Sequence, residues 1–235
     1  MSPIATQLIL WHKDHGRHHL PWQGSRDPYA VWLSEIMLQQ TQVITVIPYY
    51  ARFMQEFPTL SSLAQAPLDA VLVIWSGLGY YSRARNLHLA ARMIMQDYQG
   101  QFPDTRVILQ KLPGIGRSTA AAIAVFAFNK REAILDGNVK RILTRYFGIA
   151  GYPEESRIKN LLWEKAEEVL PVTYHENQIE TYTQALMDLG ATVCIRHTPI
   201  CKACPLQQHC VAFKEKRVDQ FPTTKLRKPL PKKEA

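Results

Sequence analysis

The chain has 235 residues, of which 46% are hydrophobic and 20% are charged, as in an ordinary globular protein with a substantial core. Its 28 Lys and Arg against 20 Asp and Glu give a net charge of +8, which favours a polyanionic partner. No apolar run approaches the roughly 20 residues of a membrane span, and the N-terminus lacks the basic start of a secretory signal, so we expect a cytoplasmic protein without membrane contact.

Apolar residues recur with helical spacing along nearly the whole chain, and the alternation typical of strands is almost absent. Ser2-Pro3 and Asp27-Pro28 each place a capping side chain before a proline, which marks a helix start. The helix after Asp27 is expected to run toward Thr41. Further helices are expected at residues 43–57, 67–75, 80–98, 104–111, 118–129, 138–147, 157–169 and 177–190. The pattern predicts an all-α fold.

Two acidic residues stand at unusual positions. The first, Glu35, lies inside the apolar helical run from Val31 to Leu38. A carboxyl group among apolar neighbours tends to keep its proton near neutral pH, so Glu35 is a candidate general acid. The local pattern taken alone favours a glutamate at the edge of a helix facing water.

Residues 112–118, Leu-Pro-Gly-Ile-Gly-Arg-Ser, form a glycine-rich turn before an alanine-rich helix. Gly114 and Gly116 permit tight backbone geometry, and the free N–H groups of the next helix attract a phosphate without reading a base. Arg117 adds a cation there, and Ser118 belongs to the same helix start. A plain helix–helix turn also explains a lone Gly-x-Gly, but the full string is more specific for a phosphate-binding hairpin.

Asp136 is the second acidic position, directly before the helix expected at 138–147. A capping role is common for Asp, and a helix N-terminus keeps a carboxylate ionised. One protonated and one ionised acid are what cleavage of a glycosidic bond uses. Glu35 and Asp136 therefore form a candidate catalytic pair if the fold brings them together.

The four cysteines, Cys194, Cys201, Cys204 and Cys210, follow the pattern C-x6-C-x2-C-x5-C. Four thiolates in one short segment suit either a tetrahedral zinc ion or a four-iron cluster, and the spacing alone leaves these two nearly even. Disulfides are a poor third choice for an intracellular protein. The composition changes after this segment, where many Lys, Arg and Pro residues predict a basic tail or linker over residues 212–235.

These motifs together resemble the helix-hairpin-helix superfamily of DNA glycosylases, which includes endonuclease III and the adenine DNA glycosylases. The resemblance runs from about Leu20 to Cys210. Its markers are Leu20-Pro21-Trp22, the run from Trp32 to Thr41, Gly77-Leu78-Gly79-Tyr80-Tyr81, the hairpin, the run from Leu135 to Arg141, and the four cysteines.

The resemblance implies two helical domains with the active site in the cleft between them. Residues 20–130 would form a six-helix domain with the helix-hairpin-helix, and residues 1–19 with 131–211 a second domain. In that family the cysteine pattern binds a [4Fe-4S] cluster, which decides between zinc and iron–sulfur. The hairpin residues Gly114, Gly116, Arg117 and Ser118 would bind DNA.

Ser118 stands where endonuclease III-like members have the lysine that forms a Schiff base and cleaves the strand. Its presence implies a monofunctional enzyme and disfavours a bifunctional pyrimidine glycosylase/lyase. Glu35 and the Gln39-Gln40 and Tyr80-Tyr81 pairs point to the adenine-removing branch. A non-catalytic DNA-binding protein is the third hypothesis, which the two acids disfavour because docking alone needs no acid in an apolar helix.

The implied reaction is hydrolysis of the N-glycosidic bond of adenine mispaired with 8-oxoguanine or guanine, in base excision repair. Glu35 would protonate the flipped adenine, by analogy at N7, and Asp136 would stabilise or transiently bond the oxocarbenium ion. The resemblance further assigns orientation of the acids to Asn138, wedges into the base stack to Gln40 and Tyr80, and the adenine pocket to Trp22, Leu38 and Gln184. The expected partner is double-stranded DNA, bound by a nucleoid-associated monomer. Such enzymes usually carry a C-terminal Nudix-like domain as well, and this chain ends soon after the cysteines, so it is either the catalytic part of a longer protein or a naturally short one.

Overall fold

The computed structural model describes residues 2–172 and 178–225, which form helices and loops and contain no strand. The α-helices are α1 (Pro3–His15), α2 (Pro28–Leu38), α3 (Val43–Glu56), α4 (Leu60–Gln65), α5 (Leu68–Trp75), α6 (Ser82–Asp97), α7 (Arg106–Leu109), α8 (Arg117–Phe128), α9 (Gly137–Phe147), α10 (Ser156–Glu168), α11 (Gln178–Thr192) and α12 (Val211–Lys214). Short 3-10 turns cover Cys201–Ala203, Gln207–His209 and Val218–Gln220. The all-α prediction is confirmed for the described residues.

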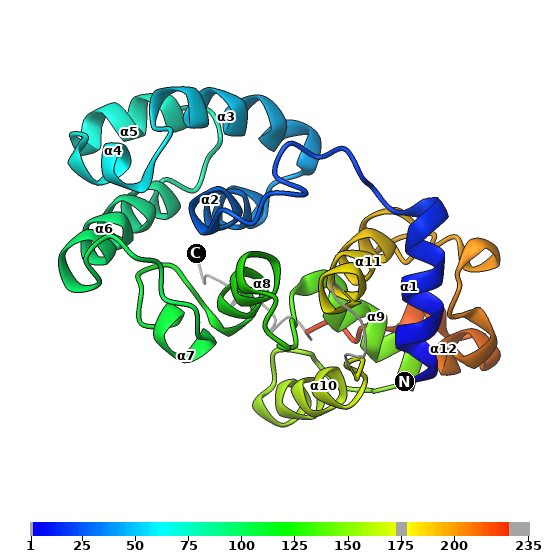
Figure 1. Ribbon diagram of the computed structural model, residues 1–235. Coiled ribbons are helices and arrows are strands. Elements are labelled where there is room, and N and C mark those ends of the chain that lie inside the picture. Colours follow the sequence, from blue (N-terminus) through cyan, green and yellow to red (C-terminus); the bar gives the residue numbers. More distant parts are fainter. Residues whose placement is uncertain (1, 173–177, 226–235) are drawn as a thin grey trace, which may run out of the picture.

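The helices form two lobes around separate hydrophobic cores (Figure 1). We call α2 to α8 the hairpin lobe, and α1 with α9 to α12 the cluster lobe. Trp32, Phe53 and Trp75 are fully buried in the hairpin lobe, and Leu8 and Tyr182 lie in the core of the cluster lobe. The chain therefore passes from the cluster lobe to the hairpin lobe after α1 and returns to the cluster lobe after α8.

Helix α8 belongs to both cores, because its alanine-rich surface is buried nearly all round. Ala120 and Ala124 pack in the hairpin lobe, whereas Ala121, Ala122 and Val125 pack in the cluster lobe. Small side chains on both faces let the two lobes approach one helix closely. The alanine run is thus what holds the lobes next to each other.

Helix α2 carries Glu35 and is sharply bounded at both ends. Asp27 caps it by accepting a hydrogen bond from the backbone N–H of Tyr29 at 3.0 Å, and Pro28 fills the first helical position. The helix ends at Leu38 rather than near Thr41, because the backbone turns into the left-handed region at Gln40, where φ is +56°. The predicted length of this helix was therefore wrong by about one turn.

The segment after Cys210 is folded, which differs from the expected linker. Phe221 is buried against the cluster lobe, and its carbonyl oxygen accepts a hydrogen bond from Nε of Arg145 at 3.0 Å. The Thr223 hydroxyl oxygen accepts another from the backbone N–H of Gly151 at 3.2 Å. A linker therefore begins later than residue 212, and residues 226–235 of the predicted tail lie outside the described part.

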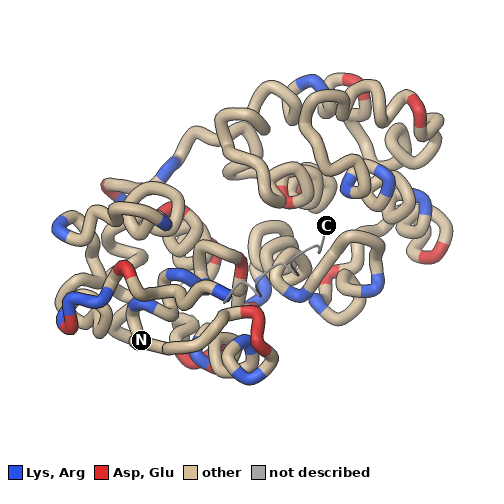
Figure 2. The backbone as a smooth tube through the Cα atoms, turned by 180° about the vertical axis from the view of Figure 1, so that it is seen from behind, with Lys and Arg blue, Asp and Glu red and all other residues tan. Residues whose placement is uncertain are grey.

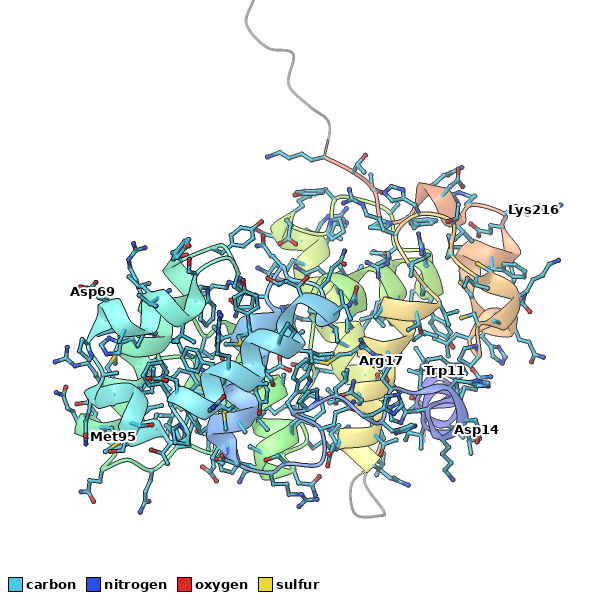
Figure 3. The ribbon with its side chains drawn as sticks, turned by 90° about the horizontal axis from the view of Figure 1, so that it is seen from above. Trp11, Asp14, Arg17, Asp69, Met95 and Lys216 are labelled. Atoms are coloured by element: carbon cyan, nitrogen blue, oxygen red, sulfur yellow. The ribbon has the colours of Figure 1, made fainter. Side chains whose placement is uncertain are left out.

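Charged side chains lie over both lobes. Figure 2 shows Lys and Arg on the hairpin lobe and the cluster lobe, with several on the segments where the two meet. Seen from above, Asp69 and Met95 mark the far end of one lobe and Lys216 the far end of the other, with Arg17 between them (Figure 3). Within the described residues, we find no helix with the length and apolar character needed to cross a bilayer.

Candidate active site

A cavity of about 480 Å³ opens where the two lobes meet. It is lined by the loop before α2 and by residues of α1, α2, α8 and α11. The side chains that line the cavity include Arg17, Trp22, Gln23, Glu35, Leu38 and Gln184. Its volume falls in the range of small-molecule sites. The fold thus places Glu35 in one cavity with all three residues predicted to form a base pocket.

Glu35 is partly exposed to this cavity and is otherwise surrounded by apolar side chains, among them Val31 and Leu38. Burial, with the negative charge of Asp136 adding to it, raises the pKa of Glu35 to about 8. This pKa favours the protonated form of Glu35 at neutral pH. The same electrostatic interaction shows that Asp136 lies close to Glu35.

Asp136 caps α9 from the cluster lobe. Its Oδ1 accepts a hydrogen bond from the backbone N–H of Val139 at 2.8 Å. Burial raises the pKa of Asp136 above its ordinary value, while the N–H groups of Val139 and Asn138 and the charge of Arg141 oppose the rise. The expectation that the helix start alone keeps this carboxylate ionised is therefore incomplete, because burial opposes it.

The two acids differ in what acts on each carboxyl group besides burial. Asp136 has two backbone N–H donors and nearby cations that oppose the rise of its pKa, whereas Glu35 has a neighbouring negative charge that adds to the rise of its own pKa. Burial aside, these interactions favour the charged form at Asp136 and the neutral form at Glu35. The two carboxyl groups lie close enough to interact electrostatically.

Asn138 reaches Asp136 through its backbone N–H, while its side chain is turned toward α11. Its Oδ1 accepts a hydrogen bond from Nη2 of Arg141 at 2.8 Å, and the same guanidinium donates to the carbonyl oxygens of Gly190 at 2.8 Å and Cys194 at 2.7 Å. A Cβ on Gly190 would lie 2.5 Å from Cβ of Asn138, so only glycine allows this close packing. Arg141 thereby connects the start of α9, which Asp136 caps, to the cysteine segment.

The hairpin residues predicted to bind a phosphate lie at and just before the start of α8. Gly114 has φ of +77°, and a Cβ there would press on Asn86. Gly116 precedes α8 without a side-chain cap, which leaves N–H groups at the helix start for a ligand. The Ser118 hydroxyl oxygen accepts a hydrogen bond from the backbone N–H of Leu135 at 2.9 Å, next to Asp136.

Arg117 differs from the expectation that it stands free at the hairpin. Its guanidinium forms an ion pair with Glu167 and stacks on the ring of Trp163, 3.8 Å from the ring centroid. Both partners belong to α10, so the sequence near the hairpin could not show them. The uncapped N–H groups at the start of α8, rather than this side chain, are therefore the groups left available to an anion.

The four cysteines line a second, apolar pocket in the cluster lobe together with Arg145. Nη1 of Arg145 donates to Sγ of Cys194 at 3.4 Å. Burial raises the pKa of Cys204 to about 12, with the other three thiols adding to the rise, so these sulfurs can be thiolates together only beside added positive charge. Within the described residues, no three Cys, His, Asp or Glu side chains converge on a single-ion site.

The match to a protein-family model decides the family. Residues 33–168, more than half of the chain, match the model described as HhH-GPD superfamily base excision DNA repair protein. The chain belongs to this superfamily.

Curated members of the HhH-GPD superfamily are similar over most of this chain. A protein named adenine DNA glycosylase from Buchnera aphidicola subsp. Acyrthosiphon pisum is 46% identical over 98% of this chain and 65% of its own length. The human protein of that name is 42% identical over 94% of this chain and 41% of its own length. The chain thus spans less than two thirds of these relatives.

Solved structures support the same superfamily. A thermostable thymine-DNA glycosylase has a TM-score of 0.79 and 30% identity, covering 90% of this chain and 95% of that one. A non-covalent endonuclease III–DNA complex has a TM-score of 0.73 at 22% identity, covering 90% and 94%. The second likeness shows the shared fold.

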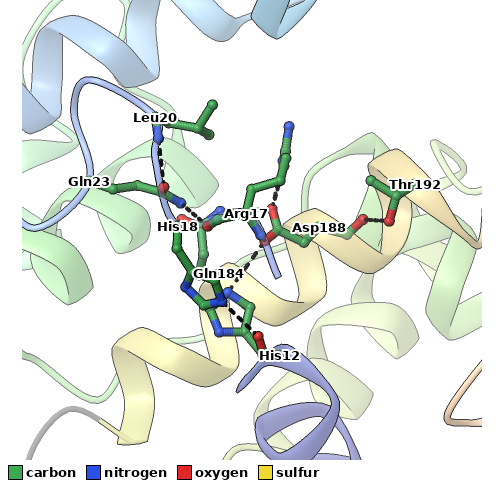
Figure 4. A network of polar contacts seen from close by, with 8 residues as sticks. All are labelled: His12, Arg17, His18, Leu20, Gln23, Gln184, Asp188 and Thr192. Carbon is green, nitrogen blue, oxygen red and sulfur yellow. Dashed lines mark hydrogen bonds and ion pairs between the residues drawn. The ribbon is translucent and has the colours of Figure 1, made fainter. Parts of the chain in front are cut away.

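This superfamily member also has a buried network beside the cavity that sequence reasoning missed (Figure 4). Asp188 is fully buried and accepts hydrogen bonds from the backbone N–H and Nε of Arg17, both at 2.7 Å, and from Nε2 of Gln184 at 2.9 Å. Nε2 of His12 lies 3.3 Å from Oδ2 of Asp188. Burial raises the pKa of Asp188, but the hydrogen bonds with His12 and Arg17 outweigh it and hold the pKa below its usual range.

The network fixes the amide of Gln184. A carboxylate can only accept, so the nitrogen of Gln184 must face Asp188 and its oxygen must point elsewhere. Gln23 extends the network by donating to the carbonyl oxygen of Arg17 at 2.7 Å. Because residues far apart in the sequence make these contacts, no local sequence motif predicts them.

Proposed function

We propose that the chain is a monofunctional DNA glycosylase of base excision repair that removes adenine mispaired with 8-oxoguanine or guanine. The observation that carries the proposal is that Glu35, whose pKa is raised to about 8, lies in the cavity between the lobes and interacts electrostatically with Asp136. The name adenine DNA glycosylase, borne by relatives 42% to 46% identical, supports adenine as the base.

The proposed reaction uses both acids on a nucleotide flipped into the cavity. Glu35 donates its proton to a ring nitrogen of adenine, which makes the base a neutral leaving group when the C–N bond breaks. Asp136, as carboxylate, stabilises the cationic sugar or bonds to it transiently, and water then completes hydrolysis. Trp22, Leu38 and Gln184 line the cavity and would hold the base.

Strand cleavage is not part of the proposal, because the residue that would have to form a Schiff base is absent. Ser118 has no amine, and its hydroxyl already accepts the hydrogen bond from Leu135. Lys140, near Asp136 along the chain, is paired with Glu154. The product would therefore be an intact strand with an abasic site.

The test of the function is excision from duplexes that carry adenine opposite 8-oxoguanine or guanine, with and without alkali afterward. We expect strand breaks only after alkali, since alkali cleaves at abasic sites. Breaks without alkali would support the lyase instead. A duplex with thymine opposite guanine serves as the comparison substrate, and cleavage of that duplex alone would reject adenine as the base.

The proposed partner is duplex DNA, bound by a monomer in the nucleoid. The N–H groups at the hairpin would bind phosphate, and the net charge of +8 supports the attraction. Removing adenine from the stack would then fall to Gln40 and Tyr80, to which the resemblance assigns the wedge.

We also infer that Cys194, Cys201, Cys204 and Cys210 hold a [4Fe-4S] cluster. All four thiols line one apolar pocket, and their C-x6-C-x2-C-x5-C spacing is the pattern that the resemblance ties to a four-iron cluster. A bound cluster supplies positive charge for four thiolates and links the segment to the folded stretch around Phe221.

Replacing Cys204 with serine is expected to abolish the visible absorbance band of the cluster and to lower the iron content, because one of four ligands is lost. The measurements are the absorption spectrum and metal analysis of the purified protein. His209→Asn, an exposed substitution in the same segment, is the control and should keep both signals. Zinc in place of iron in the unaltered protein would contradict the inference.

A further inference from the structure

Two exposed turns of the hairpin lobe have backbone conformations that L-residues rarely adopt. Gln40 has φ of +56° and Tyr80 has φ of +48°. Neither is a glycine, so each conformation must be held by its surroundings. The side chain of Tyr80 is 58% exposed, and Gln40 is exposed as well. Both side chains are thus presented to solvent from turns that the surrounding structure holds.

One buried side chain holds both turns. Arg83, only 7% exposed, donates through Nη1 to the carbonyl oxygens of Ile36 at 3.0 Å, Met37 at 2.7 Å and Gln39 at 2.6 Å. The first two are at the C-terminus of α2, where carbonyl groups lack partners within the helix and carry partial negative charge. The guanidinium therefore caps α2 and fixes the turn that contains Gln40.

The other nitrogen of Arg83 reaches the second turn. Nη2 donates to the carbonyl oxygens of Leu78 and Gly79, both at 3.3 Å, and to Oγ1 of Thr41 at 3.1 Å. The guanidinium also lies 5.4 Å from the ring centroid of Tyr80. Only the planar fork of arginine can serve acceptors on two sides in this way, because an ammonium has three donors around one point.

The same unit extends to the hairpin. Nε2 of Gln39 donates to Oγ1 of Thr119 at 3.3 Å and lies 3.4 Å from the carbonyl oxygen of Gly114. Gly114 in turn packs on Asn86, one turn after Arg83 in α6. The start of α6 is thus the common support of both turns and of the hairpin.

We propose that Arg83 is a positioning residue that sets Gln40 and Tyr80, before DNA arrives, in the conformation that penetrates the base stack. The proposal rests on the proposed function. Unstacking a base costs free energy. If the two turns also had to be ordered at that moment, the cost would rise, so a prior arrangement favours extrusion. Arg83 would then matter for opening the duplex and not for the chemistry that follows.

The test compares two substrates in single-turnover excision. One duplex carries adenine opposite 8-oxoguanine, and the other carries adenine opposite an abasic-site analogue, where stacking is already weakened. Arg83→Lys is expected to slow the first reaction about tenfold, the effect of losing a charged hydrogen bond, and the second by less than about threefold. Thr41→Val, which removes only one acceptor of the guanidinium, should show the same pattern with a smaller loss.

Arg92→Lys is the matched control, because Arg92 is exposed on the same helix, and it should change neither rate. Equal losses on both substrates would show a merely structural role for Arg83, and no loss on either would show none. Fluorescence of 2-aminopurine placed at the target position reports unstacking without excision. If the unaltered protein removed no adenine, the proposed function would fail, and Arg83→Lys would still have to lower this signal for the present inference to stand.

Discussion

Glu35→Gln is expected to slow adenine excision by about 10²- to 10⁴-fold, the usual contribution of a general acid, and to leave duplex binding unchanged. Glutamine has nearly the same shape but cannot donate a proton to the base as it leaves. The binding residues of the hairpin lie elsewhere. Single-turnover excision and binding to an uncleaved duplex measure the two effects separately. Glu56→Gln, at an exposed position of α3, is the control and should retain full activity.

The pH profile tests the same assignment. Because the acid form is the active one and the pKa of Glu35 is about 8, excision should fall as pH rises through that value. Stability should follow the same sign. The folded protein keeps a proton that the unfolded chain has lost above its lower pKa, so Glu35 destabilises the fold increasingly as pH rises toward 8. Glu35→Gln should remove that decline, and excision that survives the substitution would show that another group is the acid.

Asp136→Asn is expected to reduce excision by on the order of 10²- to 10³-fold, the effect of losing one charge-stabilising group in a buried site, with little change in melting temperature. The melting temperature should change little because asparagine caps a helix about as well as aspartate does. Its amide oxygen can still accept from Val139, but it carries no negative charge to stabilise the cationic sugar. Excision rate and thermal melting are the two measurements.

Asp27→Asn makes the same change at the start of α2 and should alter neither property. Asp136→Ala removes the cap as well, so it should lose activity and also about 1 kcal/mol of stability. Near-normal excision by Asp136→Asn would show that the capping role is the whole role of this residue.

The sequence predicted most helices because each buries a periodic apolar face, and α1, α2 and α9 also begin with a side-chain cap. Helix α4 was missed. Its six residues are too few for a period, and the cap at Thr59 is completed by Ser62 rather than by the usual Glu or Gln. The fold of the stretch after Cys210 was missed for another reason. Phe221 is one apolar residue in a basic segment, and its burial depends on Arg145, which is distant in the sequence.

At the site, the local sequence singled out the two acids but not the buried charged residues that hold their surroundings in place. Glu35 stood out because a carboxyl group interrupts an apolar helix, and Asp136 because it precedes a helix. Arg83 and Asp188 did not stand out, since a charged residue in a helix usually faces water and only tertiary packing shows that these two are buried. The turn of Arg117 toward α10 was hidden for the same reason.

Helix α1 packs against α11, which is far away in the sequence, and this constrains how the protein can be made. A ribosome releases Pro3–His15 before Gln178–Thr192, with an interval of roughly ten to thirty seconds at ordinary rates of translation. During that time Ile4 and Leu8, which belong to the core of the cluster lobe, lack the surface of α11. The hairpin lobe can assemble meanwhile, so the nascent chain should pass through a state with one lobe formed and an apolar leading helix waiting in solvent.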